Sequence, residues 1–399
     1  MPKQARCLDI TRLISRVGRG VLTGVDRVEL AYLRFFVAHG APIFGLARTS
    51  LGYVLLDRDG LEAVLHRIEG RAAWGAADWL GRLRRLPAAK ARAEADLRRL
   101  AADRCRRARL GDMLARAVPP GTRYLNVGHS NLSDRSLSGW NRVENAQVSV
   151  LVHDMIPLDF PEYQRAGTVA RFEQRMRAVA AHADRVICIS ADTERRVRHW
   201  FGQWGREVPT HVAHIGVEIP EPGEMPALEG LNRPYFVTIG TIEPRKNHAL
   251  LLDIWQDLGA QAPALVVAGP RGWENAEVFR RLDANPANVI EANGLDDGAL
   301  AALIQNAAGL LFPTLAEGFG LPPAEALGLG TPVICSDLPV LREILGDMPI
   351  YANTNNMYLW KQSILQLLGQ DDRADTSKRS KPQALPTWDA HFNRVLKVS

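Results

Sequence analysis

Residues 312–327 read FPTLAEGFGLPPAEAL, and the expected fold can be worked out from this stretch. The apolar run Gly309–Phe312 predicts a strand, and a turn that contains Gly318 and Gly320 follows it. Pro322-Pro323 is expected to begin a helix, because a proline in the first turn has no backbone N–H to leave unpaired. A strand, a glycine turn and a helix in this order are typical of a parallel α/β sheet.

The turn is a candidate site for an anion. Free backbone N–H groups before a helix attract phosphate, both as directed donors and through the helix dipole. Glu325, just inside the helix, can accept hydrogen bonds from a ribose diol, and Glu317, on the loop, can accept them from sugar hydroxyls. One anion site between two hydroxyl acceptors describes a nucleotide-sugar site, whereas the plain alternative is a tight turn followed by an exposed helix glutamate. The N–H groups concerned are those of Gly318, Phe319, Gly320 and Leu321.

Two further segments place polar side chains at the carboxyl ends of predicted strands, where α/β sheets bind ligands. Tyr235–Ile239 is followed by Arg245 and Lys246, and two cations there can neutralise a departing diphosphate. The same pair is otherwise ordinary solvated surface before a helix. Gln147–Val152 ends at His153, which suits the floor of a site because histidine both donates and accepts near neutral pH. A histidine at a strand end is also often structural.

The rest of the chain repeats this alternation of strand and helix. Arg185–Ile189 and Ala264–Ala268 are further predicted strands, so we expect parallel sheets with helices on both faces. Glycine and proline punctuate residues 215–234, which suggests a domain boundary. The expected units are residues 1–220, residues 221–380 and a short C-terminal helix at residues 387–399.

Composition excludes several classes of protein. Of the 399 residues, 46% are hydrophobic and 23% are charged, so the chain is neither disordered, collagen-like nor a coiled coil as a whole. The four cysteines are far apart without a CxxC pair, which supports neither a zinc ribbon nor a disulfide framework. No apolar run approaches the ~18 residues of a membrane span, and no signal-peptide core is visible. We therefore expect a cytoplasmic protein.

Positive charge is concentrated in residues 71–116, which hold 13 Lys and Arg against five Asp and Glu. The segment predicts one or two helices, with Pro87 as the break between them. It is either a solvated arginine-rich surface or a surface that rests on anionic lipid or holds an anionic substrate, as a peripheral membrane contact. Nucleic acid is disfavoured, because the only aromatic residues interleaved there are Trp74 and Trp79.

The Glu317–Glu325 spacing, with GFGLPPA between the two carboxylates, resembles the signature of retaining GT-B glycosyltransferases of family 4. Residues 23–28 are a weaker match to the glycine loop near the N-terminus of that family. The resemblance covers about residues 145–350, and its other motifs fall in the family's order. These are VHDMIPLDFPE (152–162), VICISADTERRV (186–197), HIGVEIP (214–220), GTIEPRKN (240–247) and AGPRGW (268–273).

The resemblance implies a GT-B fold, in which two Rossmann-like parallel-sheet domains face a cleft. The C-terminal domain would bind the sugar donor, the N-terminal domain the acceptor, and the last helix would cross back to the first domain. The family works without a bound metal or cofactor, and no DxD-like acidic motif stands in a suitable place here.

The resemblance also assigns roles to residues. Glu325 would bind the donor ribose, and Glu317 with the backbone of 318–321 would hold the sugar and diphosphate. Lys246 would contact the diphosphate, and His153 would approach the transferred sugar. The corresponding donor-binding turn begins at Gly240-Thr241, where many members have an arginine in place of Thr241; Arg245 is the expected substitute. Gly24 would lie near the acceptor or the diphosphate.

The resemblance implies a retaining hexosyltransferase that uses a nucleoside-diphosphate sugar. The EPRKN and GPRGW variants resemble mannosyltransferases that use GDP-mannose. The expected acceptor is a saccharide or a lipid-linked saccharide in surface polysaccharide synthesis. Two alternatives are a nucleotide-sugar-binding scaffold subunit that has lost turnover, suggested by Thr241, and a dinucleotide oxidoreductase. The second needs a strand–GxGxxG–helix unit, which the sequence does not contain.

Overall fold

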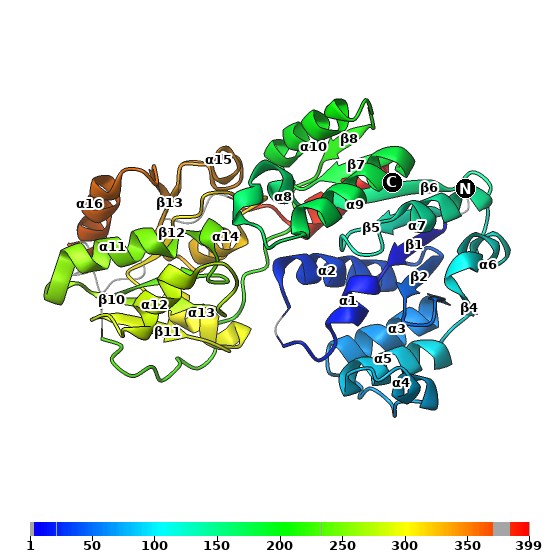
Figure 1. The fold of residues 1–399 in the computed structure, drawn as a ribbon, viewed down its shortest axis with the longest axis horizontal. Coiled ribbons are helices and arrows are strands. Elements are labelled where there is room, and N and C mark those ends of the chain that lie inside the picture. Colours follow the sequence, from blue (N-terminus) through cyan, green and yellow to red (C-terminus); the bar gives the residue numbers. More distant parts are fainter. Residues whose placement is uncertain (1–3, 21, 233, 370–383, 399) are drawn as a thin grey trace.

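The computed structural model describes residues 4–20, 22–232, 234–369 and 384–398. They form two α/β halves, each built on one sheet with helices packed around it (Figure 1). The predicted α/β class with two parallel sheets is confirmed, apart from one antiparallel strand, β3, near one edge of the first sheet.

The first half contains an eight-stranded sheet in the order β4-β3-β2-β1-β5-β6-β7-β8. Its neighbours pair in parallel except at β3, which is antiparallel to both β2 and β4. The strands are β1 (Arg6–Asp9), β2 (Ile43–Arg48), β3 (Tyr53–Leu56), β4 (Asp103–Cys105), β5 (Arg123–Asn126), β6 (Gln147–Val152), β7 (Arg185–Cys188) and β8 (Thr210–Val212). The helices are α1 (Thr11–Arg16), α2 (Gly24–Ala38), α3 (Arg58–Ile68), α4 (Trp79–Leu83), α5 (Ala88–Arg99), α6 (Leu110–Ala117), α7 (Asp134–Ser138), α8 (Ile156–Asp159), α9 (Thr168–His182) and α10 (Ala191–Gln203).

The second half contains a six-stranded, fully parallel sheet in the order β11-β10-β9-β12-β13-β14. Every residue of β10 and β12 is buried, as expected where helices cover both faces of a parallel sheet. The strands are β9 (Tyr235–Ile239), β10 (Ala264–Ala268), β11 (Val289–Ala292), β12 (Gly309–Phe312), β13 (Val333–Ser336) and β14 (Ile350–Ala352). The helices are α11 (His248–Leu258), α12 (Ala276–Asp283), α13 (Asp297–Gln305), α14 (Leu321–Gly328), α15 (Pro339–Leu345) and α16 (Met357–Leu368).

The two sheets are separated along the chain. The last strand of the first sheet ends at Val212 and the first strand of the second begins at Tyr235. The described residues between them contain neither helix nor strand, and this is the region where the sequence suggests a boundary. Part of the C-terminal end of the predicted second domain lies outside the described residues.

The expectation of one or two helices over residues 71–116 is wrong. The segment holds α4 and α5, then the strand β4 and a short 3-10 turn, and then the start of α6. The strand forms because residues 103–105 pair antiparallel with β3, where Tyr53 lies opposite Cys105, and this tertiary pairing overrides the local helical pattern. The break at Pro87 is confirmed, because Pro87 is the N-cap residue of α5.

The C-terminal helix α17 (Trp388–Val398) packs on the first half, which confirms the predicted crossing of this helix (red in Figure 1). The ring of Phe392 stacks on Phe35 of α2, with centroids 3.7 Å apart. The Nε2 atom of His391 and the hydroxyl of Tyr32 lie 2.7 Å apart in a buried hydrogen bond. The helix α17 therefore covers the aromatic side chains of Tyr32 and Phe35 on α2. None of the helices in the described ranges is both long and apolar enough to cross a membrane.

We predict that Phe392→Ala lowers the free energy of unfolding by about 3–5 kcal/mol, because it empties a well-packed aromatic site. Urea denaturation followed by tryptophan fluorescence measures the change. Asn393→Ala, at an exposed position of the same helix, is the matched control and should leave stability within about 0.5 kcal/mol of the wild type. Equal stability of the two variants would show that α17 does not dock on α2.

Candidate active site

The carboxylate of Glu317 lies between two cations from the turn after β9. Arg245 Nη1 donates to Glu317 Oε1 at 2.8 Å, and Lys246 Nζ donates to the same oxygen. The other arm of the Arg245 guanidinium donates to Glu243 Oε1 at 2.6 Å. The turn after β9 and the loop after β12 are thus joined through Glu317. The structure therefore brings together three of the four predicted catalytic residues.

Burial and charge act in opposite directions on this cluster. Burial raises the pKa of the Glu317 carboxyl, but Lys246 and Arg245 together lower it to about 2. Burial lowers the pKa of Lys246, and Glu317 offsets part of that shift. The Arg245 pKa is raised, despite burial, by Glu317 and Glu243. Two cations therefore face two carboxylates in this cluster, and the cations more than offset the effect of burial on Glu317.

The loop after β12 passes directly against the first half of the protein. A Cβ atom at Gly318 would lie 2.2 Å from the carbonyl oxygen of His153, so only glycine fits at this position. Ser190 Oγ donates to the carbonyl oxygen of Gly318 at 3.0 Å. The backbone of Gly318 and the end of β6 therefore lie in contact, which places His153 beside the Glu317 loop.

The ring of His153 is buried and neutral at physiological pH. Burial is the main cause that lowers its pKa to about 4. Its Nε2 lies 2.7 Å from the carbonyl oxygen of Val127, which can only accept, so Nε2 carries the proton. In the neutral ring, Nδ1 then holds a lone pair. Asp154, the next residue, does not orient the ring; its carboxylate accepts from the Ile156 N–H instead.

A second histidine that the sequence analysis did not single out lies beside His153. The rings of His129 and His153 are 4.9 Å apart and meet edge to face. His129 Nε2 accepts a hydrogen bond from the backbone N–H of His153 at 3.2 Å. No motif points to His129 in the sequence; it lies three residues after the end of β5 and itself adopts φ +52°.

The glycine turn has the form expected of an anion site. Gly320 adopts φ +92° as the N-cap residue of α14, and Pro322-Pro323 lies in the first turn of that helix. Within the described part of the chain, no hydrogen bond uses the backbone N–H groups of the turn. These are the N–H groups of Gly318, Phe319, Gly320 and Leu321. The predicted cluster of free N–H donors at a helix start is therefore present.

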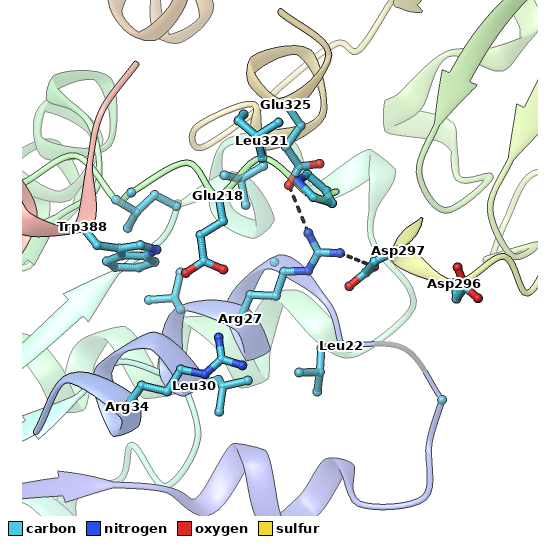
Figure 2. Close-up of a pocket in the computed structure, with 17 residues that line it drawn as sticks. Leu22, Arg27, Leu30, Arg34, Glu218, Asp296, Asp297, Leu321, Glu325 and Trp388 are labelled. Atoms are coloured by element: carbon cyan, nitrogen blue, oxygen red, sulfur yellow. Dashed lines mark hydrogen bonds and ion pairs between the residues drawn. The ribbon is translucent and has the colours of Figure 1, made fainter. Parts of the chain in front are cut away.

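A cavity of about 500 Å³ lies between α2 and the start of α14 (Figure 2). Gly24, Leu321 and Glu325 all line it, so the weak glycine-loop match and the predicted ribose ligand share one space. A Cβ atom at Gly24 would lie 3.4 Å from the Leu321 side chain. Trp388 of α17 also lines the cavity, which is therefore formed by both halves and the last helix.

Arg27 of α2 reaches across this cavity to the second half. Its guanidinium donates to Glu325 at 3.0 Å and to Asp297 at 2.6 Å, as the dashed lines in Figure 2 show. Burial raises the pKa of Glu325 to about 7, while Arg27 acts to lower it. Sequence reasoning missed Arg27, although it lies three residues after Gly24 within the quoted glycine-loop match.

The remaining predicted residues lie beside the cluster. Gly240 follows β9 with φ +136°, and a Cβ atom there would lie 3.3 Å from the Lys246 side chain. Thr241 packs against Gly272 in the neighbouring loop. Among the described residues, no group of three or more His, Cys, Asp or Glu side chains is placed to hold a metal ion. Independence from metal stays a prediction.

We predict that Arg245→Met lowers the free energy of unfolding by about 3 kcal/mol at neutral pH, because it leaves buried carboxylates short of a cation. The Glu317 pKa is depressed in the folded protein, so the stability it contributes is present above its unfolded value of 4.5 and is lost as pH falls toward 2. The deficit of the variant should therefore shrink below about pH 4.5. Urea titrations across pH measure this.

Arg280→Met is the control, because it removes an exposed ion pair with Glu277 in the same half of the protein. It should leave the free energy of unfolding close to that of the wild type and show no such trend with pH. A deficit of Arg245→Met that is equally small would mean that the buried cluster does not hold the two loops together.

Comparison with protein families matches residues 226–383 to the family described as glycosyl transferases group 1. Among curated proteins, the serotype-specific mannosyltransferase WbdA of Escherichia coli is 31% identical over 223 residues, which are 51% of this chain and 27% of WbdA. The O-antigen chain mannosyltransferase B of Escherichia coli is 30% identical over 58% of this chain and 63% of its own length. The chain thus spans about a quarter of WbdA.

Solved structures share the whole fold. HepE of Anabaena, in complex with UDP-glucose, matches with a TM-score of 0.63 at 12% identity and covers 99% of both chains. Sucrose-phosphate synthase of Thermosynechococcus elongatus matches with a TM-score of 0.63 at 16% identity over 100% of both. These neighbours have the GT-B fold, which confirms the predicted fold class. Residues 226–383 therefore match the glycosyl transferases group 1 family, and the described residues form the two parallel-sheet halves of a GT-B fold.

Proposed function

We propose that this protein is a glycosyltransferase that moves a hexose from a nucleoside-diphosphate sugar to a hydroxyl of a saccharide or a lipid-linked saccharide. The sugar would be mannose and the donor GDP-mannose, in the synthesis of a surface polysaccharide. The mannosyltransferase names of the relatives at about 30% identity support this choice of sugar and pathway. The absence of a suitable metal-binding group among the described residues is compatible with transfer without metal.

One observation carries the proposal. The ion cluster of Arg245, Lys246 and Glu317 lies beside the free N–H groups of the glycine turn, and Glu325 lines a cavity at the same helix start. A nucleoside-diphosphate sugar needs these three things in this order: hydroxyl acceptors for the ribose, donors for the diphosphate, and polar groups at the sugar. No other cluster in the described residues offers them together.

Departure of the nucleoside diphosphate creates negative charge on the oxygen that leaves the sugar. Fixed cations at that oxygen lower the barrier, since charge that develops in the transition state meets donors already in place. Arg245 and Lys246 hold their positions through Glu317 before any substrate binds, so little reorganisation is needed. We assign them to the diphosphate, with Arg245 in place of the arginine that many family members carry at the position of Thr241.

Retention of anomeric configuration fits the chemistry of Glu317. A carboxylate with a pKa near 2, bonded to two cations, is a weak nucleophile, so attack by the enzyme on the far face of the sugar is disfavoured. We infer that the acceptor hydroxyl attacks on the same face from which the diphosphate departs. His153, with its lone pair at Nδ1, would accept a hydrogen bond from a hydroxyl of the transferred sugar.

Contact between the two halves would keep water from the donor. Gly318 and His153 meet at the backbone, and Ser190 bonds the same loop. A bound donor would lie along this contact, where exclusion of water limits its hydrolysis. The acceptor would then approach from the first half, in which His153 and His129 lie.

We predict that Lys246→Met lowers kcat for mannose transfer at least about 100-fold, because one fixed cation at the leaving group is lost. The assay follows GDP release from GDP-mannose in EDTA, with methyl α-mannoside and mannose 1-phosphate as acceptors in parallel, and with water alone as a separate measurement of hydrolysis. Lys361→Met is the control, since Lys361 pairs with Asp257 on the surface of the same half and should leave kcat unchanged.

Two results would contradict the proposal. Transfer that survives in Lys246→Met would remove this cluster from the reaction. Binding of GDP-mannose by the wild type without any turnover, with acceptor or with water, would favour the scaffold alternative over the enzyme.

A further inference from the structure

A second cavity, of about 280 Å³, lies in the first half and belongs to none of the donor-site features. Four of the side chains that line it are cations, namely Arg48, Lys90, Arg107 and Arg175. Hydroxyl and amide groups supply most of the remaining wall, among them Ser50 and Asn131. No carboxylate lines the cavity, so its lining carries a net positive charge.

Three of these cations have no acidic partner. Within the described ranges, the guanidinium groups of Arg48, Arg107 and Arg175 form neither an ion pair nor a hydrogen bond. This is unusual for the region, since Arg98 and Arg99 of the neighbouring α5 both pair with aspartates. Unpaired arginines gathered in one cavity repel one another, which an anionic ligand would relieve.

Two carboxylates that hydrogen-bond residues of the lining are already engaged. Asp9 accepts from the Thr11 N–H at 3.0 Å and from Asn131 Nδ2 at 2.8 Å. Glu94, buried in α5, accepts hydrogen bonds from the N–H and the hydroxyl of Ser50. It also lies 3.7 Å from an Arg98 nitrogen and 3.9 Å from Lys90 Nζ. Glu94 therefore holds Ser50 in position and lies near the charge of Lys90. It forms no ion pair with Arg48, Arg107 or Arg175 in the described residues.

The cavity faces the same edge of the sheet as His153. Arg48 ends β2 and Asn131 follows β5, so both lie at the carboxyl ends of parallel strands, as His153 does after β6. Arg175 belongs to α9, which also carries Phe172, whose ring is 6.1 Å from that of His129. The cavity thus lies on the side of His153 from which an acceptor would approach.

An adjoining cavity extends the positive surface outward. It shares Ser50 and Arg107 with the first and adds Arg84 and Arg106, both exposed and without an ion pair in the described residues. Part of the positive charge of residues 71–116 therefore lines these two cavities. Other cations of the segment form ion pairs, such as Arg98 with Asp78 and Arg116 with Asp103.

We propose that the cavity lined by Arg48, Arg107 and Arg175 binds a phosphate or diphosphate group carried by the acceptor. The inference rests on the proposed function, because it assigns the acceptor side of that site. Guanidinium groups match the oxygens of phosphate with paired hydrogen bonds, whereas a neutral saccharide gains nothing from three unpaired charges. The acceptor is thus a phosphorylated one, either a lipid diphosphate or a soluble sugar phosphate.

The test measures binding of inorganic pyrophosphate by calorimetry, with GDP present in excess so that the donor site is occupied. Wild-type protein should bind pyrophosphate, and Arg48→Gln/Arg107→Gln should bind it at least about tenfold more weakly, because two charged hydrogen-bond donors are lost. Arg206→Gln is the matched control, at an exposed position before β8 on the opposite edge of the sheet, and should bind as the wild type does.

GDP binding is measured in the same series, so failure of the donor site and failure of this cavity are read separately. The double variant should bind GDP normally. If it also binds pyrophosphate like the wild type, the proposal is overturned, whatever the donor site does. If the double variant does not fold, Arg175→Gln, a single substitution in α9, repeats the comparison.

Two further arms identify the source of the phosphate. Flotation with neutral phosphatidylcholine vesicles that contain a polyprenyl diphosphate tests the lipid, and mannose 1-phosphate tests the soluble ligand. If either ligand binds the wild type and Arg48→Gln/Arg107→Gln weakens that binding, the result supports the cavity and identifies its ligand. The proposal would be overturned by two results together: the wild type does not bind pyrophosphate, and the double variant floats with phosphatidylglycerol vesicles as fully as the wild type. The positive surface would then be a general membrane contact.

Discussion

The ion cluster around Glu317 is the interaction on which the rest of the site depends. Burial alone would raise the pKa of this carboxyl, but Lys246 and Arg245 lower it to about 2. In return it fixes both cations at the end of β9 and fixes its own loop after β12. A buried ion cluster stabilises a fold weakly and specifies geometry well. Here the geometry that it specifies is the path of the glycine turn into α14.

The same loop is also where the two halves of the protein meet. Gly318 lies against the backbone of His153, and Glu343 of α15 accepts from the N–H of Ala191 at the start of α10 and pairs with His214. Arg27 crosses to Glu325 in the cavity beyond. A ligand bound along the glycine turn would therefore touch groups from both halves.

Local chemistry in the sequence predicted the parts of the site that follow strands. The glycine turn before Pro322-Pro323 predicted a helix start. The pair of cations after β9 was predicted to lie near it, because the carboxyl ends of parallel strands lie at one edge of the sheet. No local sequence pattern predicted the contacts that join segments far apart in the chain. Arg27 and Glu325 are 298 residues apart, and the strand β4 inside a helix-like segment forms only through its pairing with β3. Of the three free arginines of the first half, only Arg107 lies in the charged segment 71–116, and the cavity that gathers all three forms only in the fold.

The most direct test of the account is a calorimetric titration with GDP, UDP and ADP in EDTA, on wild-type protein and on Glu325→Gln. The account predicts that one nucleotide binds without metal, and that the variant binds it at least about tenfold more weakly, because the ribose loses a charged acceptor. Failure of every nucleotide to bind, or equal binding by the variant, would contradict the assignment of this cavity to the donor.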